Sequence, residues 1–296
     1  MAMDVGPLVD EERAVVSRRI FADEAIYQEE MEQIYGHCWL MLGHESQLRQ
    51  PKDFFASYMG EERVLVTRDN AGALHAFLNT CRHRGMRVCR ADKGSAAAFT
   101  CTYHGWTYAN DGELIGVPRF EDDYFGELDK SALGLIPVAQ LDTYKGLIFA
   151  TFDPAAPSLS AYLGEAAWYL DCILDRTGEG SELIGDPQKW TMKANWKFFI
   201  DNHIGDMYHV PYTHGSPLRV NPRFGQATPP DDRLGFQVRP GLGNGLGVRM
   251  EDADRFAETV EPPIGDYLRA TQATAMAHLG PVRGDLQLIH GALFPN

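Results

Sequence analysis

Short apolar stretches separated by turn signals dominate the first half of the chain. Stretches rich in β-branched and aromatic side chains predict strands over residues 39–43, 54–58, 63–67, 73–78, 106–108, 113–115 and 147–152. Clusters of Asp, Asn and Gly at residues 69–72 and 110–112 predict turns between neighbouring strands. Short strands with frequent turns are typical of a small antiparallel β domain.

The pattern becomes helical elsewhere. Within residues 23–35, Tyr27, Met31 and Ile34 recur at a spacing of three to four, and Asp23 stands where a first-turn acid is expected. Helices are also expected over residues 159–174, 195–209 and 265–279, with a strand over 285–294 and loop over 215–245. The Pro-rich residues 153–158 predict a linker. We therefore expect an α+β protein with a helical segment at residues 1–37 and domains at 38–156 and 157–296.

Bulk composition narrows the class of protein. The 296 residues suggest two domains of about 150 residues each. No apolar run approaches the ~20 residues of a membrane span, and the N-terminus lacks the pattern of a secretory signal, so a cytoplasmic protein is expected. The net charge of −14 disfavours nucleic acid and anionic membranes as partners. Five cysteines form too sparse and odd a set for a disulfide framework.

Two short Cys–His pairs carry the strongest chemical signal. Cys81 and His83 form C-x-H, and Cys101 and His104 form C-x-x-H. Two thiolates and two imidazoles are the ligands of a Rieske [2Fe-2S] cluster. Zinc also accepts Cys₂His₂, but zinc fingers keep like ligands together, whereas each pair here holds one Cys and one His. The spacing therefore favours the cluster over zinc.

A basic stretch lies between and beside the two Cys–His pairs. It holds Arg82, Arg84, Arg87, Arg90 and Lys93, against a single acid, Asp92. One interpretation is a solvated basic loop, or a set of charges paired with acids elsewhere. The other is a docking patch that steers an acidic electron donor to the cluster.

A second site is indicated further along the chain. On a helix over residues 195–209, Asn202, Asp206 and His209 align on one side next to an apolar face. Pro211 should end this helix and let the chain turn, which would bring His214 back towards His209. Two imidazoles and a carboxylate make the facial triad of non-haem Fe(II) oxygenases, although such residues can also be ordinary interior or capping groups.

Both segments resemble a known family. The run CRHRGMRVC…CTYHGW is similar to the Rieske motif of aromatic-ring-hydroxylating oxygenase α subunits, and D-x-x-H-x₄-H resembles their iron-binding motif. The resemblance implies a Rieske domain followed by a catalytic domain of antiparallel sheet flanked by helices, on which the N-terminal segment would pack. It makes Cys81, His83, Cys101 and His104 the cluster ligands.

The resemblance also assigns the second site. It makes His209 and His214 the ligands of a mononuclear Fe(II), and Asp206 the bridge to a cluster histidine of a neighbouring subunit. Asp206 as the carboxylate ligand itself is the alternative that the helix geometry leaves open. Asn202 would lie beside the iron, and the remaining candidates, which would border the substrate pocket, are His203, Met207 and Val210.

The implied activity is that of a terminal oxygenase in a multicomponent dioxygenase. Electrons would come from NAD(P)H through a ferredoxin or reductase, and O₂ would hydroxylate an aromatic substrate, usually to a cis-dihydrodiol and in some members by monohydroxylation. The implied assembly is a homotrimer of α subunits, with a small β subunit in many relatives. A Rieske electron carrier or a cluster-binding fragment without oxygenase chemistry is the alternative.

The third iron ligand poses a difficulty. In the family it is an Asp much nearer the C-terminus, and no acid between Asp231 and Asp285 stands in a similar context. The resemblance therefore implies that the chain is incomplete at its C-terminus, with the ligand beyond residue 296. A downstream acid of this chain, or water, is the alternative.

Overall fold

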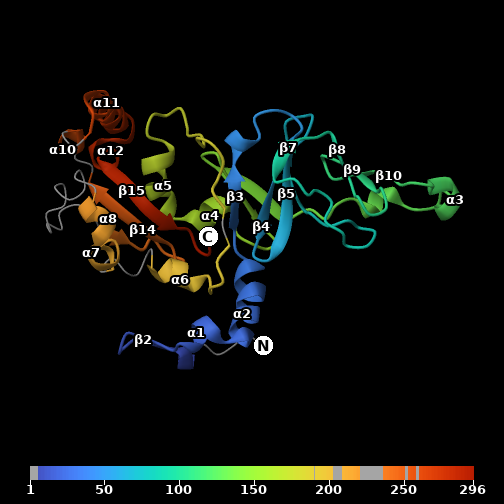
Figure 1. The fold of residues 1–296 in the computed structure, drawn as a ribbon, viewed down its shortest axis with the longest axis horizontal. Helices are drawn as coiled ribbons and strands as arrows, with labels where there is room; N and C mark the ends of the chain where they lie inside the picture. The colour runs from blue at the N-terminus through green and yellow to red at the C-terminus, as the bar shows by residue number, and fades with distance from the viewer. Residues whose placement is uncertain (1–5, 190, 203–208, 221–235, 251–252, 258–259) are drawn as a thin grey trace. The chain divides into compact units, whose positions relative to one another are not determined.

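The computed structural model describes residues 6–189, 191–202, 209–220, 236–250, 253–257 and 260–296. Figure 1 shows the order of the elements along the chain. The chain forms two compact units. The β-rich unit comprises Gln28–Leu159 and Glu182–Lys189, and the mixed unit comprises Met1–Tyr27, Ser160–Ser181 and Trp190–Asn296.

The β-rich unit is built from three small antiparallel sheets. Their strand orders are β6-β5-β4-β7, β10-β9-β8 and β11-β12-β3. The strands are β3 (Leu40–His44), β4 (Asp53–Met59), β5 (Glu62–Arg68), β6 (Leu74–Leu78), β7 (Lys93–Ser95), β8 (Ala98–Thr100), β9 (Thr107–Ala109), β10 (Leu114–Gly116), β11 (Gln140–Tyr144) and β12 (Leu147–Thr151). Every stretch that was expected to form a strand in this unit overlaps one, so these predictions are confirmed. Strands β7, β8 and β11 were not predicted.

The central strand β5 separates two apolar cores. Leu65 packs into the core that also holds Cys81 and Cys101, whereas Val64 and Val66 pack into the core on the other face. All three side chains are fully buried. A strand covered on both faces reads as a continuous apolar run, as residues 64–66 do. Strand β5, which the apolar pattern predicts, thus packs directly against the core that holds Cys81 and Cys101.

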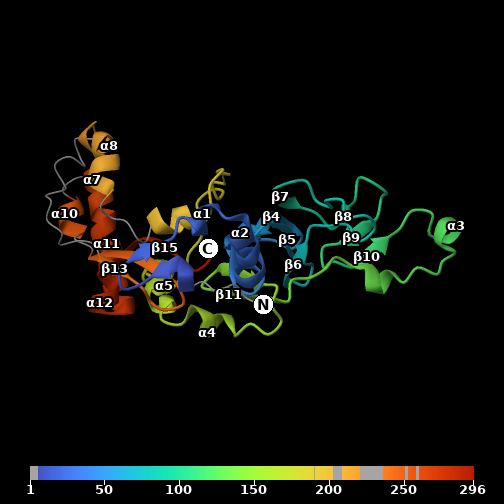
Figure 2. The ribbon, with the colours of Figure 1, turned by 90° about the horizontal axis from the view of Figure 1, so that it is seen from below.

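Short helices occupy the connections of the β-rich unit. They are η2 (Met31–Tyr35), η3 (Glu45–Gln47), α3 (Phe120–Tyr124) and η4 (Lys130–Leu133). Figure 2 shows α3 in a long excursion beyond the β8–β9–β10 sheet. The backbone has a positive φ at both ends of α3, at Arg119 (54°) and Phe125 (55°), which is uncommon outside glycine. The helix is therefore held between two sharp changes of chain direction.

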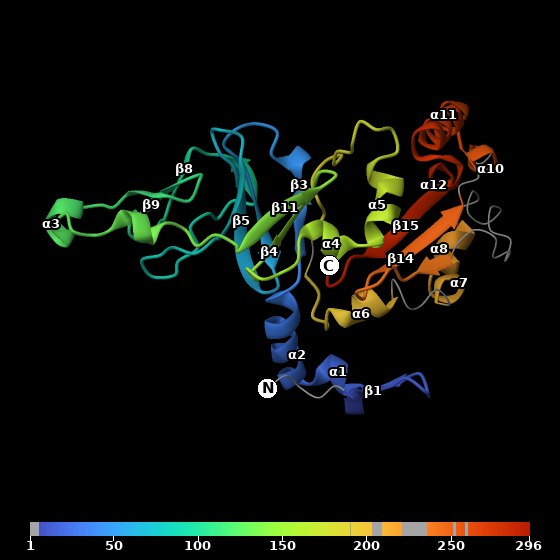
Figure 3. The same cartoon turned by 180° about the vertical axis from the view of Figure 1, so that it is seen from behind.

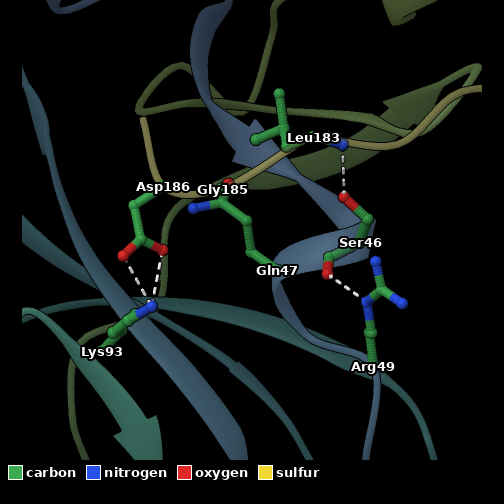
Figure 4. Close-up of a pocket in the computed structure, with 7 residues that line it drawn as sticks. All are labelled: Ser46, Gln47, Arg49, Lys93, Leu183, Gly185 and Asp186. Atoms are coloured by element: carbon green, nitrogen blue, oxygen red, sulfur yellow. Dashed lines mark hydrogen bonds and ion pairs between the residues drawn. The ribbon is translucent and has the colours of Figure 1, made fainter. Parts of the chain in front are cut away.

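The returning segment, residues 182–189, joins the β-rich unit from a distant part of the chain. Lys93 Nζ pairs with Asp186 at 2.6 Å, and the amide of Leu183 donates to Ser46 Oγ at 3.0 Å (Figure 4). Arg49 pairs with Glu182 at 2.6 Å. These contacts surround a polar cavity of about 330 Å³. The segment is thus attached mainly through exposed charges and not through an apolar core.

The described residues of the mixed unit combine helices with a three-stranded antiparallel sheet, of order β13-β14-β15, and a two-stranded one, β1-β2. Figure 3 shows helix α5 lying against β15 in the three-stranded sheet. Its elements are η1 (Gly6–Leu8), β1 (Val9–Asp10), β2 (Val15–Val16), α1 (Arg19–Ala22), α4 (Leu159–Leu163), α5 (Ala166–Leu174), α6 (Lys197–Ile200), α7 (Val210–Thr213), α8 (Gly215–Val220), β13 (Phe236–Val238), β14 (Gly245–Met250), α10 (Ala253–Ala257), α11 (Pro262–Leu279), α12 (Pro281–Gly284) and β15 (Leu286–Ala292). Helix α2 (Glu24–Glu30) follows α1 and leads into η2.

Apolar contacts and a partly buried ion pair hold α5 to its neighbours. Cys172 of α5 packs with Leu246, Val248 and Leu286 of the sheet. Arg283 of α12 pairs with Asp171 of α5 at 2.5 Å. At the N-terminal end of the chain, Phe21 stacks on Phe198 of α6 with ring centroids 4.3 Å apart. Residues 1–27 therefore form part of the mixed unit, whereas residues 28–37 belong to the β-rich unit.

The predicted helices are confirmed in part. Helix α2 with η2 covers the expected residues 23–35, and α11 and β15 cover the expected helix and strand near the C-terminus. The single helix expected over residues 159–174 is wrong, because Gly164 has a positive φ of 48° and separates α4 from α5. The expected loop over 215–245 is wrong for α8 and β13.

The helix expected over residues 195–209 also differs. Its described part is α6, and residues 203–208 lie outside the described residues. The end expected at Pro211 is wrong, since Val210 begins α7 and Pro211 lies in its first turn. A proline is tolerated there because the first amides of a helix have no intrahelical acceptor.

No helix among the described residues is long and apolar enough to cross a membrane.

Candidate metal centres

Two loops of matching geometry present the Cys–His pairs. We call residues 81–86 and 101–106 the first and second Cys–His loops. In each loop the cysteine amide donates to the carbonyl five residues later, at 2.8 Å. Gly85 and Gly105 each donate to the carbonyl of their own cysteine at 2.9 Å, with φ of 72° and 73°. A positive φ is freely available to glycine, so each loop can close tightly beneath its histidine.

The four predicted cluster ligands are brought together by these loops. Cys81 and Cys101 are buried at 3% and 1% exposure in the same apolar core. The imidazoles of His83 and His104 lie with centroids 4.5 Å apart. Two thiols and two imidazoles from opposed loops form the donor set of a Rieske cluster.

The surroundings of one imidazole suit a metal ligand. His83 Nδ1 is buried and has no hydrogen-bond partner among the residues that the structure describes. Burial, with smaller effects from the charges of His104 and Arg84, lowers the pKa of His83 and favours the neutral form. A buried nitrogen without a partner is costly unless another group binds it. The residues present therefore fit a [2Fe-2S] cluster.

A buried tyrosine next to Cys81 was not found by sequence reasoning. Tyr108 Oη lies 3.3 Å from Cys81 Sγ and accepts a hydrogen bond from the amide of Arg82 at 3.0 Å. Burial is the largest of the effects that raise the pKa of Tyr108 well above its usual value, so the hydroxyl stays protonated. The position of Tyr108 in β9, four residues after His104, is the only signal in the sequence.

Asn79 is hydrogen-bonded to Cys89 within the basic stretch, and sequence reasoning did not find this contact either. Its side-chain amide donates to the carbonyl of Cys89, and its side-chain oxygen accepts from the amide of Cys89, both at 2.8 Å. Asn79 is buried at 1% exposure. Cys89 is a free, buried thiol outside the pairs, and burial raises its pKa. These two hydrogen bonds join Asn79, which precedes the first Cys–His loop, to Cys89, which follows it.

Some cationic side chains of the basic stretch contact other groups of the protein, and others are exposed on the surface. Arg87 donates to the carbonyl of Cys89 at 2.8 Å, and Lys93 pairs with Asp186. Arg82, Arg84 and Arg90 are exposed. The interpretation as paired charges is thus confirmed for Lys93, and three arginines remain on the surface around the cluster loops.

The second site is described only in part. The rings of His209 and His214 lie with centroids 5.3 Å apart, so the predicted pairing is confirmed as a juxtaposition. The turn of α7 produces it, since Thr213 N donates to the carbonyl of His209 at 2.7 Å. His214 and Asn202 are exposed. The backbone of Val210 is described, whereas Asp206, His203 and Met207 lie outside the described residues.

Two neighbouring imidazoles are suited to bind one divalent iron, given further oxygen ligands. In the described ranges, no third His, Cys, Asp or Glu side chain joins His209 and His214 in a group that could hold a metal ion. The described residues therefore bring two imidazoles side by side.

Comparisons with known proteins match both units. Two protein-family models match the chain, the Rieske [2Fe-2S] domain at residues 38–142 and the ring hydroxylating alpha subunit (catalytic domain) at residues 159–296. The α subunit of biphenyl 2,3-dioxygenase from Rhodococcus jostii (strain RHA1) is 41% identical over 303 residues, covering 99% of this chain and 65% of the relative. The α subunit of chlorobenzene dioxygenase from Cupriavidus sp. (strain PS12) is 42% identical, covering 99% of this chain and 67% of the relative.

A solved structure shows the same fold. Naphthalene 1,2-dioxygenase with indole bound in its active site superposes with a TM-score of 0.88 at 36% identity, covering 100% of this chain and 67% of that one. The predicted α+β class, with a Rieske domain followed by a catalytic domain, is thereby confirmed. The chain spans 65% of the length of the biphenyl 2,3-dioxygenase α subunit and 66% of that of a benzene 1,2-dioxygenase α subunit from Pseudomonas putida.

Both cofactors follow from the matched domains. A Rieske domain holds a [2Fe-2S] cluster, and the ring-hydroxylating catalytic domain holds a mononuclear iron. The match over residues 159–296 is to a domain that a simple Rieske electron carrier would not need. With both domains matched in order, the chain belongs to the α subunits of the Rieske-type aromatic-ring-hydroxylating oxygenases.

Proposed function

We propose that this chain acts as the terminal oxygenase of a multicomponent dioxygenase that hydroxylates a small aromatic substrate. The observation that carries the proposal is the presence, in one chain, of two groups of side chains whose chemistry suits metal ligation. The Cys–His loops lie in the β-rich unit, and the pair His209–His214 lies in the mixed unit. The named relatives act on biphenyl, benzene and chlorobenzene, which supports an aromatic hydrocarbon as the substrate class.

In this proposal Cys81, His83, Cys101 and His104 hold the cluster. The cluster, when bound, stores one electron at a time. Tyr108 donates a hydrogen bond to the sulfur of Cys81, and the core around Cys81 and Cys101 excludes water from the two thiolates. The chain thus sets the polarity around the cluster while the cluster supplies the redox chemistry.

His209 and His214 hold the Fe(II) in the proposal. When bound, this iron supplies the site of O₂ activation next to the substrate. We assign Asp206 to the hydrogen-bonded link between a cluster histidine and this site. Asn202 is assigned to the surroundings of the iron, and the pocket border is assigned to His203, Met207 and Val210.

Electron delivery is proposed to come from a ferredoxin or reductase that draws on NAD(P)H, which places the protein in the cytoplasm. The exposed cations Arg82, Arg84 and Arg90 near the cluster loops support an acidic donor. The proposed assembly is a homotrimer of α subunits with a small β subunit as a further component, by analogy with the family.

The proposal is tested by product analysis with ¹⁸O₂ in a reaction that contains donor proteins, NADH and biphenyl. We expect a cis-dihydrodiol that carries two ¹⁸O atoms. Cys101→Ser should abolish both the cluster and the product, whereas the matched variant Cys89→Ser should keep both, because Cys89 lies outside the Cys–His pairs. Product without a cluster, or a loaded enzyme that forms no product from any aromatic hydrocarbon, would overturn the proposal.

A further inference from the structure

The two Cys–His loops differ in the side chain at their last position. Met86 ends the first loop and Trp106 ends the second, and the carbonyl of each accepts from the cysteine amide of its own loop. Met86 is a partly buried residue at the edge of the core. The backbone pattern is therefore matched, while the side chains are not.

The indole of Trp106 crosses from its own loop to the histidine of the other. Its ring lies parallel to the imidazole of His83, with an interplanar angle of 7° and centroids 5.0 Å apart. This is an offset-stacked arrangement, which aromatic pairs prefer over direct face-to-face contact. One side chain thus connects the two loops that carry the cluster ligands.

The indole is itself held in place. Trp106 is 4% exposed and belongs to the core that contains both cluster cysteines. The ring of Tyr124, the last residue of α3, meets Trp106 edge to face with centroids 6.3 Å apart. With one face on His83 and Tyr124 against it as well, the indole has little freedom to rotate.

The second imidazole has a different surrounding. The ring next to His104 is Tyr103, whose centroid lies 3.8 Å away at a tilt of 33°. Tyr103 is 57% exposed, in contrast to the buried Trp106. The two imidazoles are both half-buried, and they differ in the ring that stacks on them, which is buried for His83 and exposed for His104.

We propose that Trp106 is a positioning residue for the cluster, which fixes the ring plane of His83 and holds water away from one of its faces. The proposal rests on His83 as a cluster ligand, and it does not depend on ring hydroxylation. Its expected effect is a lower reduction potential than an uncovered imidazole would give. Reduction adds one negative charge, and nearby water stabilises that charge, so a face covered by indole disfavours the reduced form.

The test uses the full chain loaded with its cluster, in the variants Trp106→Leu, Trp106→Phe and Met86→Leu. Iron and acid-labile sulfide report assembly, an EPR-monitored redox titration reports the midpoint potential, and pulsed EPR resolves the couplings of the two ligating nitrogens. For Trp106→Leu we expect about a tenfold shift of the oxidised-to-reduced ratio towards reduction at fixed potential, which is ~59 mV for one electron. One of the two nitrogen couplings should change.

The other variants separate stacking from volume. Trp106→Phe keeps an aromatic face and should stay close to the parent protein, and Met86→Leu, at the matching position of the first loop, should leave potential and couplings unchanged. The proposal is overturned if Trp106→Leu keeps the parent potential and both couplings, or if Trp106→Phe shifts them as far as Trp106→Leu.

A further variant covers failure of assembly. If Trp106→Leu does not assemble the cluster, the variant Tyr124→Leu tests the proposal instead. It removes the ring that restrains the indole of Trp106 while the indole itself is retained. A smaller shift of the same sign, with one altered coupling, supports the proposal. Parent values in Tyr124→Leu overturn it. Since none of these measurements needs turnover, failure of the oxygenase proposal would be seen separately, in product analysis.

Discussion

Tyr108 Oη lies 3.3 Å from Cys81 Sγ while it accepts a hydrogen bond from the amide of Arg82. Because the oxygen is occupied as an acceptor, the hydroxyl proton is directed to the sulfur, which as a thiolate ligand can only accept. A hydrogen bond to a cluster sulfur withdraws negative charge and favours the reduced form. This contact should therefore raise the reduction potential.

We predict that Tyr108→Phe lowers the midpoint potential of the cluster, by roughly 59 mV if the oxidised-to-reduced ratio changes about tenfold. An EPR-monitored titration measures this value. Tyr58→Phe is the matched control, because Tyr58 is 55% exposed and its hydroxyl contacts Arg63. Equal midpoint potentials in Tyr108→Phe and the parent protein would show that this hydrogen bond does not affect the potential.

His209 and His214 should be required for the mononuclear iron alone. We predict that His209→Ala and His214→Ala each lower the iron content from about three to about two atoms per chain, with sulfide held at about two. The reason is that removal of one of two imidazoles leaves too few ligands for Fe(II), while the Cys–His loops lie in the other unit. Loss of sulfide in either variant would contradict separate sites; His278→Ala serves as the control.

The exposed arginines near the cluster loops should speed electron delivery from an acidic donor. We predict that the double variant Arg82→Glu and Arg84→Glu slows reduction by the donor at least tenfold at low salt, because like charges suppress encounter. The difference should shrink as ionic strength rises, since salt screens exposed charges. Stopped-flow reduction gives these rates. Arg63→Glu, an exposed site in β5, should have a smaller effect; equal slowing there would indicate net charge and not docking.

The stability of the chain should fall below neutral pH because of His44. This residue ends β3 at 4% exposure, and Ser46 donates its amide to Nδ1 at 3.1 Å. Burial lowers the pKa of His44 and outweighs the opposing charges of Glu45 and Glu182. The unfolded chain therefore binds this proton more readily than the folded one. Stability is fully present above about pH 6.5 and is lost as the pH falls towards the lower folded-state pKa.

We predict that His44→Gln flattens this dependence. Between pH 6.5 and 5 the parent should lose up to about 1.4 kcal/mol of unfolding free energy per pH unit from one proton. Denaturant unfolding at several pH values measures the loss for both proteins. His75→Gln is the control, as His75 is only partly buried and pairs with Asp69 at 2.8 Å. Parallel curves for the parent and His44→Gln would show that another group is responsible.

Apolar patterning predicted the parts of the fold that local sequence determines. The run at residues 64–66 reads as a strand because β5 is buried on both faces. Strand β7 was missed because Lys93–Ser95 is exposed and polar, and it forms only by pairing with β4. The break at Gly164 was missed because the apolar spacing continues across it while the backbone does not.

The candidate site likewise has a part that the sequence predicted and a part that it did not. The spacing of Cys81, His83, Cys101 and His104 identified the cluster ligands as candidates, because each pair is close in sequence. Tyr108 and Trp106 contact residues of the first Cys–His loop from a distant part of the sequence, and such contacts exist only after the sheets have formed. No periodicity in one sequence reports a contact of that kind.

The returning segment has a consequence for how the two units can be separated. Residues 182–189 belong to the β-rich unit, while the residues on either side belong to the mixed unit. Cutting the chain within residues 153–158 would leave Lys93 without Asp186 and the carbonyl of Ala56 without Lys189. The β-rich unit is therefore not a module that can be excised or exchanged between relatives as one uninterrupted piece of sequence. A transplant would need to carry both pieces, joined by a new connection.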